Sequence, residues 1–547
     1  MFYAIAMRIR ICVFFLASVV FFHIYFIVIY CIFPRGNHLF KPFLPNPNPL
    51  LEAVMKKVMV SLVLFMIVAA MIQGCVSPAS VTDNQLAEQK YANFAHSDIS
   101  DLTFLKGQTT LEWLNLDSNL FSDISPLSSL TNLTWLNLRN NYLISDISPL
   151  AGLHKLTYLN LEGNWRITSI ATLAGLTSLE DLSLLSVSGV TDISPLSKLT
   201  NLKKLDLGWA NSITTYNACS TLTKLEWVRL GGMAATSISG ISKLPSLQTI
   251  LMADNAIKLI DVSNLPSLKS FDFHKCDSVP VVSLSNMPVL DTLDLSPVNG
   301  LVRLSLNNLA GLHYLKVGGQ FFDSLYLQGL TSISYLEING DNVKNISYVT
   351  GLTSLKTLSI TSQSITKITE LAGLTGLTSL SLRGDGFVDI SPIQGLTSLT
   401  SLTLSYCGSI TNLSPLSGLT NLENLNLSNS SGITSIATLA GLTKLKSLNM
   451  RYCQKLDSAL PDMSALTQLR YLNINNCSTL KNISGISTLT GINNLDIRYS
   501  MGLNPTITAP ILQIMTSSAD TLLFSSGQLD SSQTAALTAA GVIWTQY

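Results

Sequence analysis

The chain has 547 residues and a formal net charge of zero, because 33 Lys and Arg side chains balance 33 Asp and Glu side chains. This neutrality argues against a nucleic-acid-binding protein, which needs a basic face to displace counterions from phosphates. Hydrophobic residues make up 47% of the chain and are regularly spaced over most of it, which argues against disorder.

The N-terminal region contains two apolar segments in succession. The first, residues 11–33, carries no Asp, Glu, Lys or Arg and is long enough to span a bilayer. Two interpretations remain open for it. Either residues 1–54 are an extension upstream of a true start at Met55, or residues 11–33 are a transmembrane helix.

The second segment, residues 55–75, has the organisation of an export signal. Lys56 and Lys57 form a basic start, residues 58–70 are apolar, and Ile72-Gln73-Gly74-Cys75 follows. The end of this segment resembles the lipobox of bacterial lipoproteins. That resemblance implies a lipid on Cys75, contact with a membrane through it, and a surface-exposed place in the cell envelope, in the outer membrane if the cell is Gram-negative.

The rest of the chain is dominated by an internal repeat. The pattern L-x-x-L-x-L-x-x-[N/C] starts 18 times between residues 111 and 502, at intervals of 21 to 24 residues. This is the leucine-rich-repeat signature. It predicts an α/β solenoid shaped as a horseshoe, with a parallel β-sheet on the concave face, because each L-x-L strand buries its leucines against neighbouring repeats.

The second half of each repeat predicts the convex face. The motif D-I-S-P-L or D-I-S-P-I starts at 123, 146, 192 and 389, and it favours short 3-10 segments with Ser as N-cap and Pro at the first helical position. Residues from about 245 to 330 lack the motif, so we expect extended backs and a change of curvature there.

The repeats, such as LTNLTWLNLRNNYLISDISPLAGL at 130–153, resemble the internalin-like subfamily of bacterial leucine-rich-repeat proteins over about residues 95–500. The resemblance implies binding of an extracellular protein through the concave face. We expect a tether and N-terminal cap over 76–110, with a short helix through about Phe94, the repeats over 111–502, and a cap of strand, helix and strand over 503–547.

One position of the repeat, eight residues after its first leucine, is expected to form a buried structural ladder. Amide side chains there satisfy backbone groups of the turn, and Cys replaces them as a small apolar residue. We therefore expect neither disulfides nor a zinc site from these residues, which are Asn119, Asn141, Asn164, Asn255, Cys276, Cys407, Cys453 and Cys477.

The candidate binding residues lie on the concave side of the strands. Trp113, Trp135 and Tyr158 occupy one position in three consecutive repeats, and aromatic residues are enriched at interface hot spots. The alternative is that these aromatics only pack across neighbouring strands. The other candidates for the same face are Asp117, Arg139, Glu162, Trp227 and Tyr335.

These residues predict binding of a protein ligand, with a host-cell receptor as one candidate, by a monomer. A glycan is the alternative ligand, because aromatic platforms beside Asn and Ser also suit sugars. We expect no enzyme and no cofactor, since no catalytic motif is present and the concave acids Asp206, Asp272 and Asp294 read as ordinary solvated residues. No metal is expected, because the row of Asp123, Asp146 and Asp192 is interrupted by Ser169.

Overall fold

A computed structural model describes residues 88–547, apart from the positions at the end of this paragraph and the side chains of 253–255 and 324. The apolar stretch 11–33, the export signal 55–75 and its Cys75 therefore lie outside the described residues. Within the described part of the chain, no helix has both the length and the apolar character needed to cross a membrane. The undescribed positions are 233–234, 236, 256, 274–275, 277–278, 297, 299, 320–323, 341, 504–510, 512 and 516–519.

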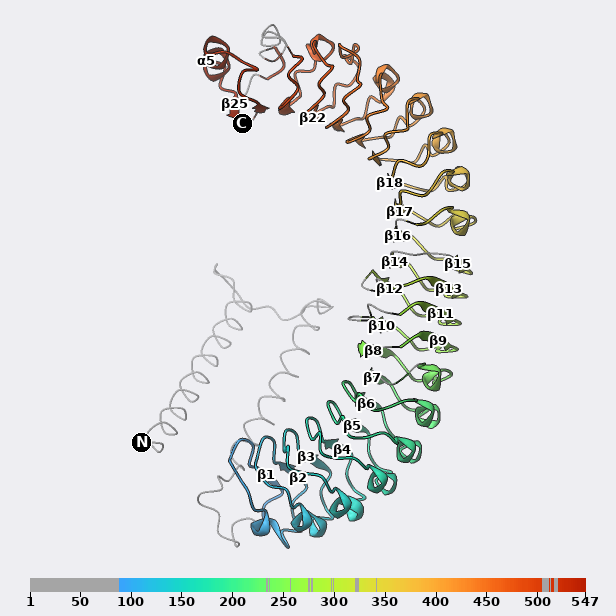
Figure 1. The fold of residues 1–547 in the computed structure, drawn as a ribbon, viewed down its shortest axis with the longest axis vertical. Helices are drawn as coiled ribbons and strands as arrows, with labels where there is room; N and C mark the ends of the chain where they lie inside the picture. The colour runs from blue at the N-terminus through green and yellow to red at the C-terminus, as the bar shows by residue number, and fades with distance from the viewer. Residues whose placement is uncertain are drawn as a thin grey trace, which may run out of the picture. The chain divides into compact units, whose positions relative to one another are not determined.

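The first half of the array forms a nine-stranded parallel sheet on the concave side (Figure 1). Its strands pair in order along the chain until β8 pairs with β10. They are β1 (Tyr91–Asn93), β2 (Trp113–Asn115), β3 (Trp135–Asn137), β4 (Tyr158–Asn160), β5 (Asp181–Ser183), β6 (Lys204–Leu207), β7 (Trp227–Gly232), β8 (Thr249–Asn255) and β10 (Ser270–Asp272).

The second half of the array forms a separate sheet of twelve parallel strands. It contains β12 (Thr292–Leu295), β14 (Tyr314–Gly318), β16 (Tyr335–Asn339), β17 (Thr357–Thr361), β18 (Ser379–Arg383), β19 (Ser401–Ser405), β20 (Asn424–Asn426), β21 (Ser447–Asn449), β22 (Tyr471–Asn473), β23 (Asn494–Asp496), β24 (Thr521–Phe524) and β25 (Ile543–Gln546).

The repeating leucines lie between the two faces and form one continuous core. Leu114, Leu136 and Leu159 sit opposite one another on adjacent strands and are fully buried. A single short strand cannot remove its leucines from water, so each repeat depends on its neighbours for burial. The solenoid predicted from the leucine spacing is thus present.

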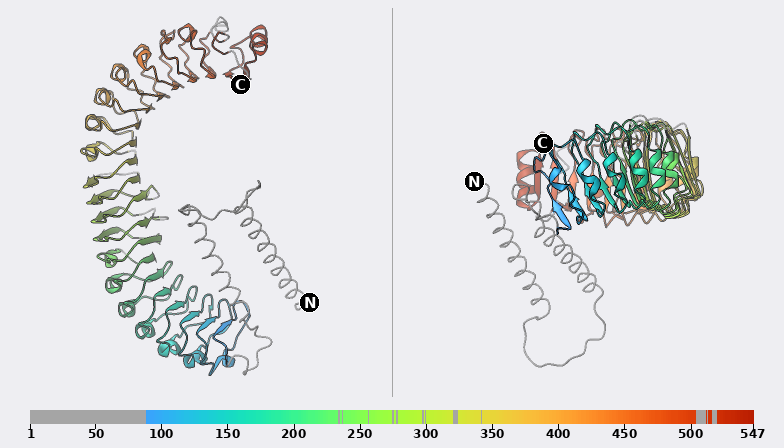
Figure 2. Two further views of the ribbon diagram at one scale, coloured as in Figure 1. Left: turned by 180° about the vertical axis from the view of Figure 1, so that it is seen from behind. Right: turned by 90° about the horizontal axis from the view of Figure 1, so that it is seen from below.

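The convex side of most repeats carries a short 3-10 helix, which follows the outer face of the arc (Figure 2). These helices are η2 (Thr103–Leu105), η3 (Ser125–Ser129), η4 (Ser148–Gly152), η5 (Ala171–Gly175), η6 (Ser194–Lys198), η7 (Asn217–Thr221), η8 (Ser239–Ile241), η9 (Ser347–Val349), η10 (Thr369–Gly373), η11 (Ser391–Ile393), η12 (Ser414–Leu416), η13 (Ala437–Gly441) and η14 (Ser484–Ile486).

The start of these helices corrects one expectation. Ser148 is the first residue of η4 rather than its N-cap. The capping group is the carboxylate of Asp146, which accepts hydrogen bonds from the Ser148 N–H and hydroxyl, both at 2.8 Å. Asp123, Asp192 and Asp389 make the same pair of bonds, so the aspartate row has a structural role.

In the middle of the array the convex side changes from helix to strand, as expected from the missing D-I-S-P-L motif. A four-stranded parallel sheet forms there, in the order β15, β13, β11, β9. Strands on both faces have the same spacing, about 4.8 Å, so this stretch curves less than the helix-backed repeats (Figure 1). Its members are β9 (Leu259–Ser263), β11 (Val281–Ser285), β13 (Arg303–Asn307) and β15 (Ser324–Gln328).

The two ends of the array behave differently from each other. The helix expected to run through Phe94 is wrong over its described part, because Tyr91–Asn93 form β1 and pair in register with β2. Pairing with the edge of β2 therefore determines the conformation of this segment. At the C-terminal end, β24, α5 (Ser531–Ala539) and β25 follow the expected order of strand, helix and strand.

The aspartate caps give a prediction with a defined pH dependence. Hydrogen bonds from Ser148 and Ser194 lower the pKa of Asp146 and Asp192 below the ordinary value of 3.8. A lowered folded-state pKa stabilises the protein above 3.8, and the contribution disappears as the pH falls through the folded-state value.

We therefore expect D146A/D192A to reduce the urea midpoint at neutral pH, and the gap to wild type to shrink below pH 3.8. The matched control is D146N/D192N, which should lie closer to wild type because Asn412 caps η12 through the same N–H bond. A gap that stays constant with pH would contradict the assigned role.

Candidate functional site

Three aromatic side chains on the concave face form a continuous stack. Trp113, Trp135 and Tyr158 are opposite one another in the register of β2, β3 and β4. The Trp113 and Trp135 rings lie 4.4 Å apart between centroids and 13° from parallel, and the Trp135 and Tyr158 rings lie 4.6 Å apart and 6° from parallel. In-register parallel strands therefore bring the predicted aromatic row together.

The stack determines which parts of the rings face solvent. Each ring covers a face of its neighbour, so all three side chains are half-buried and Trp135 has both faces covered. Burial also raises the pKa of Tyr158. The stack itself therefore leaves only the ring edges and the outer faces of Trp113 and Tyr158 uncovered.

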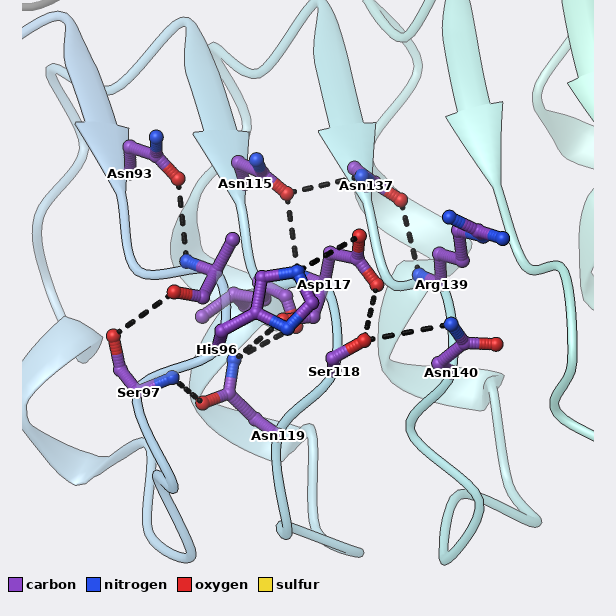
Figure 3. Close-up of polar contacts among 12 residues, drawn as sticks. Asn93, His96, Ser97, Asn115, Asp117, Ser118, Asn119, Asn137, Arg139 and Asn140 are labelled. Atoms are coloured by element: carbon purple, nitrogen blue, oxygen red, sulfur yellow. Dashed lines mark hydrogen bonds and ion pairs between the residues drawn. The ribbon is translucent and has the colours of Figure 1, made fainter.

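A row of asparagines lies beside the aromatic stack, and their side-chain amides hydrogen-bond to the backbone just after each strand. The Oδ1 atoms of Asn115 and Asn137 accept the backbone N–H two residues later, at 3.1 Å and 3.0 Å (Figure 3). Asn160 does the same at 2.9 Å, and Asn137 also donates to Asn115. These amide oxygens are therefore already used within the fold.

Two of the three charged residues predicted for this face, Arg139 and Glu162, pair with each other. The closest nitrogen and oxygen of this pair are 3.0 Å apart. Asp117 lies 3.9 Å from His96 and accepts a hydrogen bond from the Ser118 hydroxyl at 2.8 Å (Figure 3). Because opposite charges alternate along the row, the N-terminal part of the concave face presents paired rather than single-sign charge.

An exposed apolar stripe runs along the loops of the same repeats, and we did not expect it from the sequence. Leu120, Tyr142 and Trp165 are 54%, 49% and 50% exposed, and each directly follows a ladder asparagine. The guanidinium of Arg166 lies 5.1 Å from the Trp165 ring centroid. Their shared place directly after the final Asn of the repeat pattern L-x-x-L-x-L-x-x-N is the signal that could have revealed them.

Trp227 and Tyr335 do not join the N-terminal stack. Trp227 lies on β7 between Lys204 and Arg229, whose cationic groups are 5.3 Å and 5.5 Å from its ring centroid. Tyr335 lies in the other concave sheet, stacked on Tyr314 at 4.5 Å. The predicted binding residues thus form one cluster on β2–β4 and two separate aromatic positions.

The ladder asparagines are buried at the ends of their strands. The Nδ2 group of Asn141 donates to the carbonyls of Leu116, Leu138 and Arg139 at 2.9, 2.9 and 3.0 Å. Its Oδ1 accepts from the Asn119 N–H at 3.0 Å, and Asn119 and Asn164 donate in the same way. Each amide thus connects two repeats through their backbone.

The ladder cysteines are buried free thiols. Cys407, Cys453 and Cys477 each lie against a carbonyl of the preceding repeat, and burial raises the pKa of each thiol to about 12. Cys276 is also buried and belongs to no disulfide within the described part of the chain, whereas the side chain of Asn255 lies outside the described residues. Ser430 and Ser500 occupy the same position and donate to carbonyls, which the sequence reading missed.

The concave acids are dispersed. Asp206 lies 3.3 Å from Arg229, and burial raises its pKa, whereas Asp294 accepts bonds from Ser296. Asp272 and Asp294 line a shallow hollow with Tyr314, where the concave face passes from one sheet to the other. Among the described residues, no group of three His, Cys, Asp or Glu side chains could hold a metal ion.

Comparison with known proteins agrees with this architecture. Residues 131–175 and 397–441 match the family model described as Leucine Rich repeats (2 copies). No curated protein sequence matches the chain. The fold is that of a leucine-rich-repeat horseshoe, with the parallel sheet on its concave face.

Several solved structures are similar at low identity. An internalin (inlF) from Listeria monocytogenes is 23% identical, with 76% of this chain and 88% of that chain covered and a TM-score of 0.26. The InlJ functional domain from the same organism, which includes a cysteine ladder, is 19% identical, with 81% of this chain and 76% of that chain covered and a TM-score of 0.30. A chain of a TLR13–ssRNA13 complex is 20% identical, with 82% of this chain and 76% of that chain covered and a TM-score of 0.43. These values carry no information on the partner of this chain.

The ladder predicts a large effect from one buried amide. Asn141→Ala removes four hydrogen bonds and leaves three carbonyls and an N–H without that partner, so we expect a loss of about 2–4 kcal/mol in unfolding free energy. The matched control is Asn132→Ala, whose exposed amide donates to the Thr109 carbonyl and should cost less than about 1 kcal/mol. Urea unfolding measures both, and equal losses would contradict the ladder's role.

Proposed function

We propose that this chain is a bacterial surface lipoprotein of the internalin-like kind, which binds a protein partner through the N-terminal part of its concave face. The observation that carries the proposal is the stack of Trp113, Trp135 and Tyr158, with the exposed stripe of Leu120, Tyr142 and Trp165 in the same repeats. Together they define the N-terminal surface.

The chemistry of the N-terminal surface favours a protein over other ligands. Trp and Tyr are enriched among the residues that dominate binding energy at protein interfaces. An exposed apolar stripe has no core to fill, and burying it against a partner removes apolar area from water. The paired charges of Arg139 and Glu162 leave little single-sign potential, so apolar contact is the main source of affinity.

A glycan is the weaker alternative for this surface. Sugars stack on open aromatic faces, but the faces of Trp113, Trp135 and Tyr158 largely cover one another. The Oδ1 atoms of Asn115, Asn137 and Asn160, which could receive sugar hydroxyls, already accept backbone N–H groups. Trp165 keeps an exposed ring, so a glycan array on the full chain separates the two ligand classes.

Substitution at the N-terminal surface tests the proposal. With a partner isolated from an extracellular protein mixture, we expect W113A/W135A to weaken binding by about a thousandfold in a Kd titration on immobilised protein, because two interface hot spots contribute about 2 kcal/mol each. Leu120→Glu with Tyr142→Glu should weaken it comparably, and these exposed positions leave the stack intact.

The matched control is Tyr326→Ala, which removes an exposed aromatic side chain from convex strand β15. It should leave the Kd unchanged. If both N-terminal variants fold like wild type and bind the partner as tightly as the control, the N-terminal surface is not the binding site.

The lipid anchor needs a separate experiment. In cells fed an alkyne fatty acid, we expect the full chain to incorporate the label and to fractionate with membranes. Cys75→Ala should lose both properties, whereas Cys219→Ala, which changes a buried thiol in η7, should keep them. Membrane association that survives Cys75→Ala without label would instead support a span formed by residues 11–33.

A further inference from the structure

We propose a second binding surface, on the C-terminal third of the array, that holds an extended acidic segment of a protein partner. Its residues are Arg383, Tyr406, Arg451, Tyr452 and Tyr499, which lie along one edge of the concave sheet where the strands end; we call it the arginine–tyrosine edge. It shares no residue with the N-terminal surface and does not depend on that proposal.

The tyrosines of this edge occupy a strained backbone position. Tyr406, Tyr452 and Tyr499 have φ values of 57°, 62° and 56°, in the left-handed region that bulky residues rarely adopt. The intervening repeats place Asn429 and Asn476 there, and asparagine tolerates this conformation. Backbone preference therefore does not account for tyrosine, and strain of this kind concentrates at binding sites.

The tyrosine side chains are placed toward solvent. Tyr406 and Tyr499 are 42% and 51% exposed, which leaves their phenol groups accessible. Arginines from the same edge lie against the rings, with Arg383 4.1 Å from the Tyr406 centroid and Arg451 4.8 Å from the Tyr452 centroid. This contact orients each guanidinium before a ligand arrives, which reduces the entropy lost on binding.

The two arginines carry charge that the fold does not neutralise. Among the described residues, neither Arg383 nor Arg451 lies within ion-pair distance of a carboxylate, whereas Arg498 binds Asp496 at 2.8 Å. The nearby carboxylate of Asp385 accepts a hydrogen bond from the Gly408 N–H. Arg139, the residue equivalent to Arg383 and Arg451 in an N-terminal repeat, is paired with Glu162.

A shallow depression with an uncharged lining lies in the sheet beside the edge. Ser401, Thr403, Asn424 and Ser447 line it together with Tyr471. No carboxylate in this lining repels an acidic ligand. The edge and its depression combine Tyr, Ser and Asn with Arg. Antibody binding loops have the same composition, and they recognise proteins through adaptable polar contacts around rigid aromatic anchors.

The spacing of the arginines defines the ligand more closely. Arg383 ends β18 and Arg451 lies two residues after β21. These strands are three intervals apart in the sheet, which is about 14 Å at the usual strand spacing. An extended chain covers about 3.3–3.6 Å per residue, so carboxylates four residues apart match both guanidinium groups. The segment expected here reads acid-x-x-x-acid in extended conformation.

The experiment uses the full chain and a fluorescent peptide of repeated Glu-Ser-Gly-Ser units, followed by fluorescence anisotropy. We expect R383Q/R451Q to bind this peptide about tenfold or more weakly than wild type, and Y406N/Y452N, which places asparagine as the intervening repeats do, to weaken it measurably. The matched control is R470Q/K481Q, which removes the same charge from exposed side chains elsewhere in this region.

The outcomes separate the alternatives. Equal weakening by R383Q/R451Q and R470Q/K481Q, or no binding by wild type, would overturn the proposal, as would equal affinity for a peptide with Gln in place of Glu. Heparin or a single-stranded oligonucleotide that binds this edge more tightly than the peptide would overturn the partner class. W113A/W135A should leave peptide binding unchanged, which keeps this result independent of the N-terminal surface.

Discussion

The stability of this protein depends on the stacking of each repeat's buried leucines against those of the next repeat. Leu114, Leu136 and Leu159 illustrate the arrangement, because each is buried only while its neighbours are in place. The same in-register pairing converts any residue that recurs in the sequence into a row on the surface. Aromatic, amide, charged and apolar rows on the N-terminal repeats are therefore consequences of one packing rule.

The surface rows differ in what the fold leaves available to a partner. In the N-terminal repeats the ring faces, amide oxygens and charges are mostly satisfied internally, and the exposed stripe of Leu120, Tyr142 and Trp165 supplies apolar area. On the C-terminal third the shallow depression in the concave sheet has an uncharged lining, and Arg383 and Arg451 remain without acidic partners among the described residues. The two ends thus offer chemically distinct surfaces.

Sequence periodicity was sufficient for the solenoid, the leucine core, the 3-10 backs and the extended middle, because each follows from the positions of apolar residues and Pro. It did not reveal that Asp146 caps η4, since that depends on loop geometry rather than on residue type. The prediction of a helix was also wrong at Tyr91–Asn93, because these residues form strand β1 and pair with the edge of β2. The stacking of Trp113 on Trp135 follows from the register, but the pairing of Arg139 with Glu162 follows from side-chain conformations that a sequence does not specify.

The central claim is that the N-terminal surface, and not the convex side, meets the protein partner. Hydroxyl-radical footprinting of the full chain, read by mass spectrometry with and without its isolated partner, measures this directly because exposed Trp and Tyr side chains are oxidised readily. The account predicts that the partner protects Tyr142 and Trp165, while Tyr326 on β15 keeps its oxidation rate. Protection of Tyr326 with no change at Tyr142 and Trp165 would contradict it.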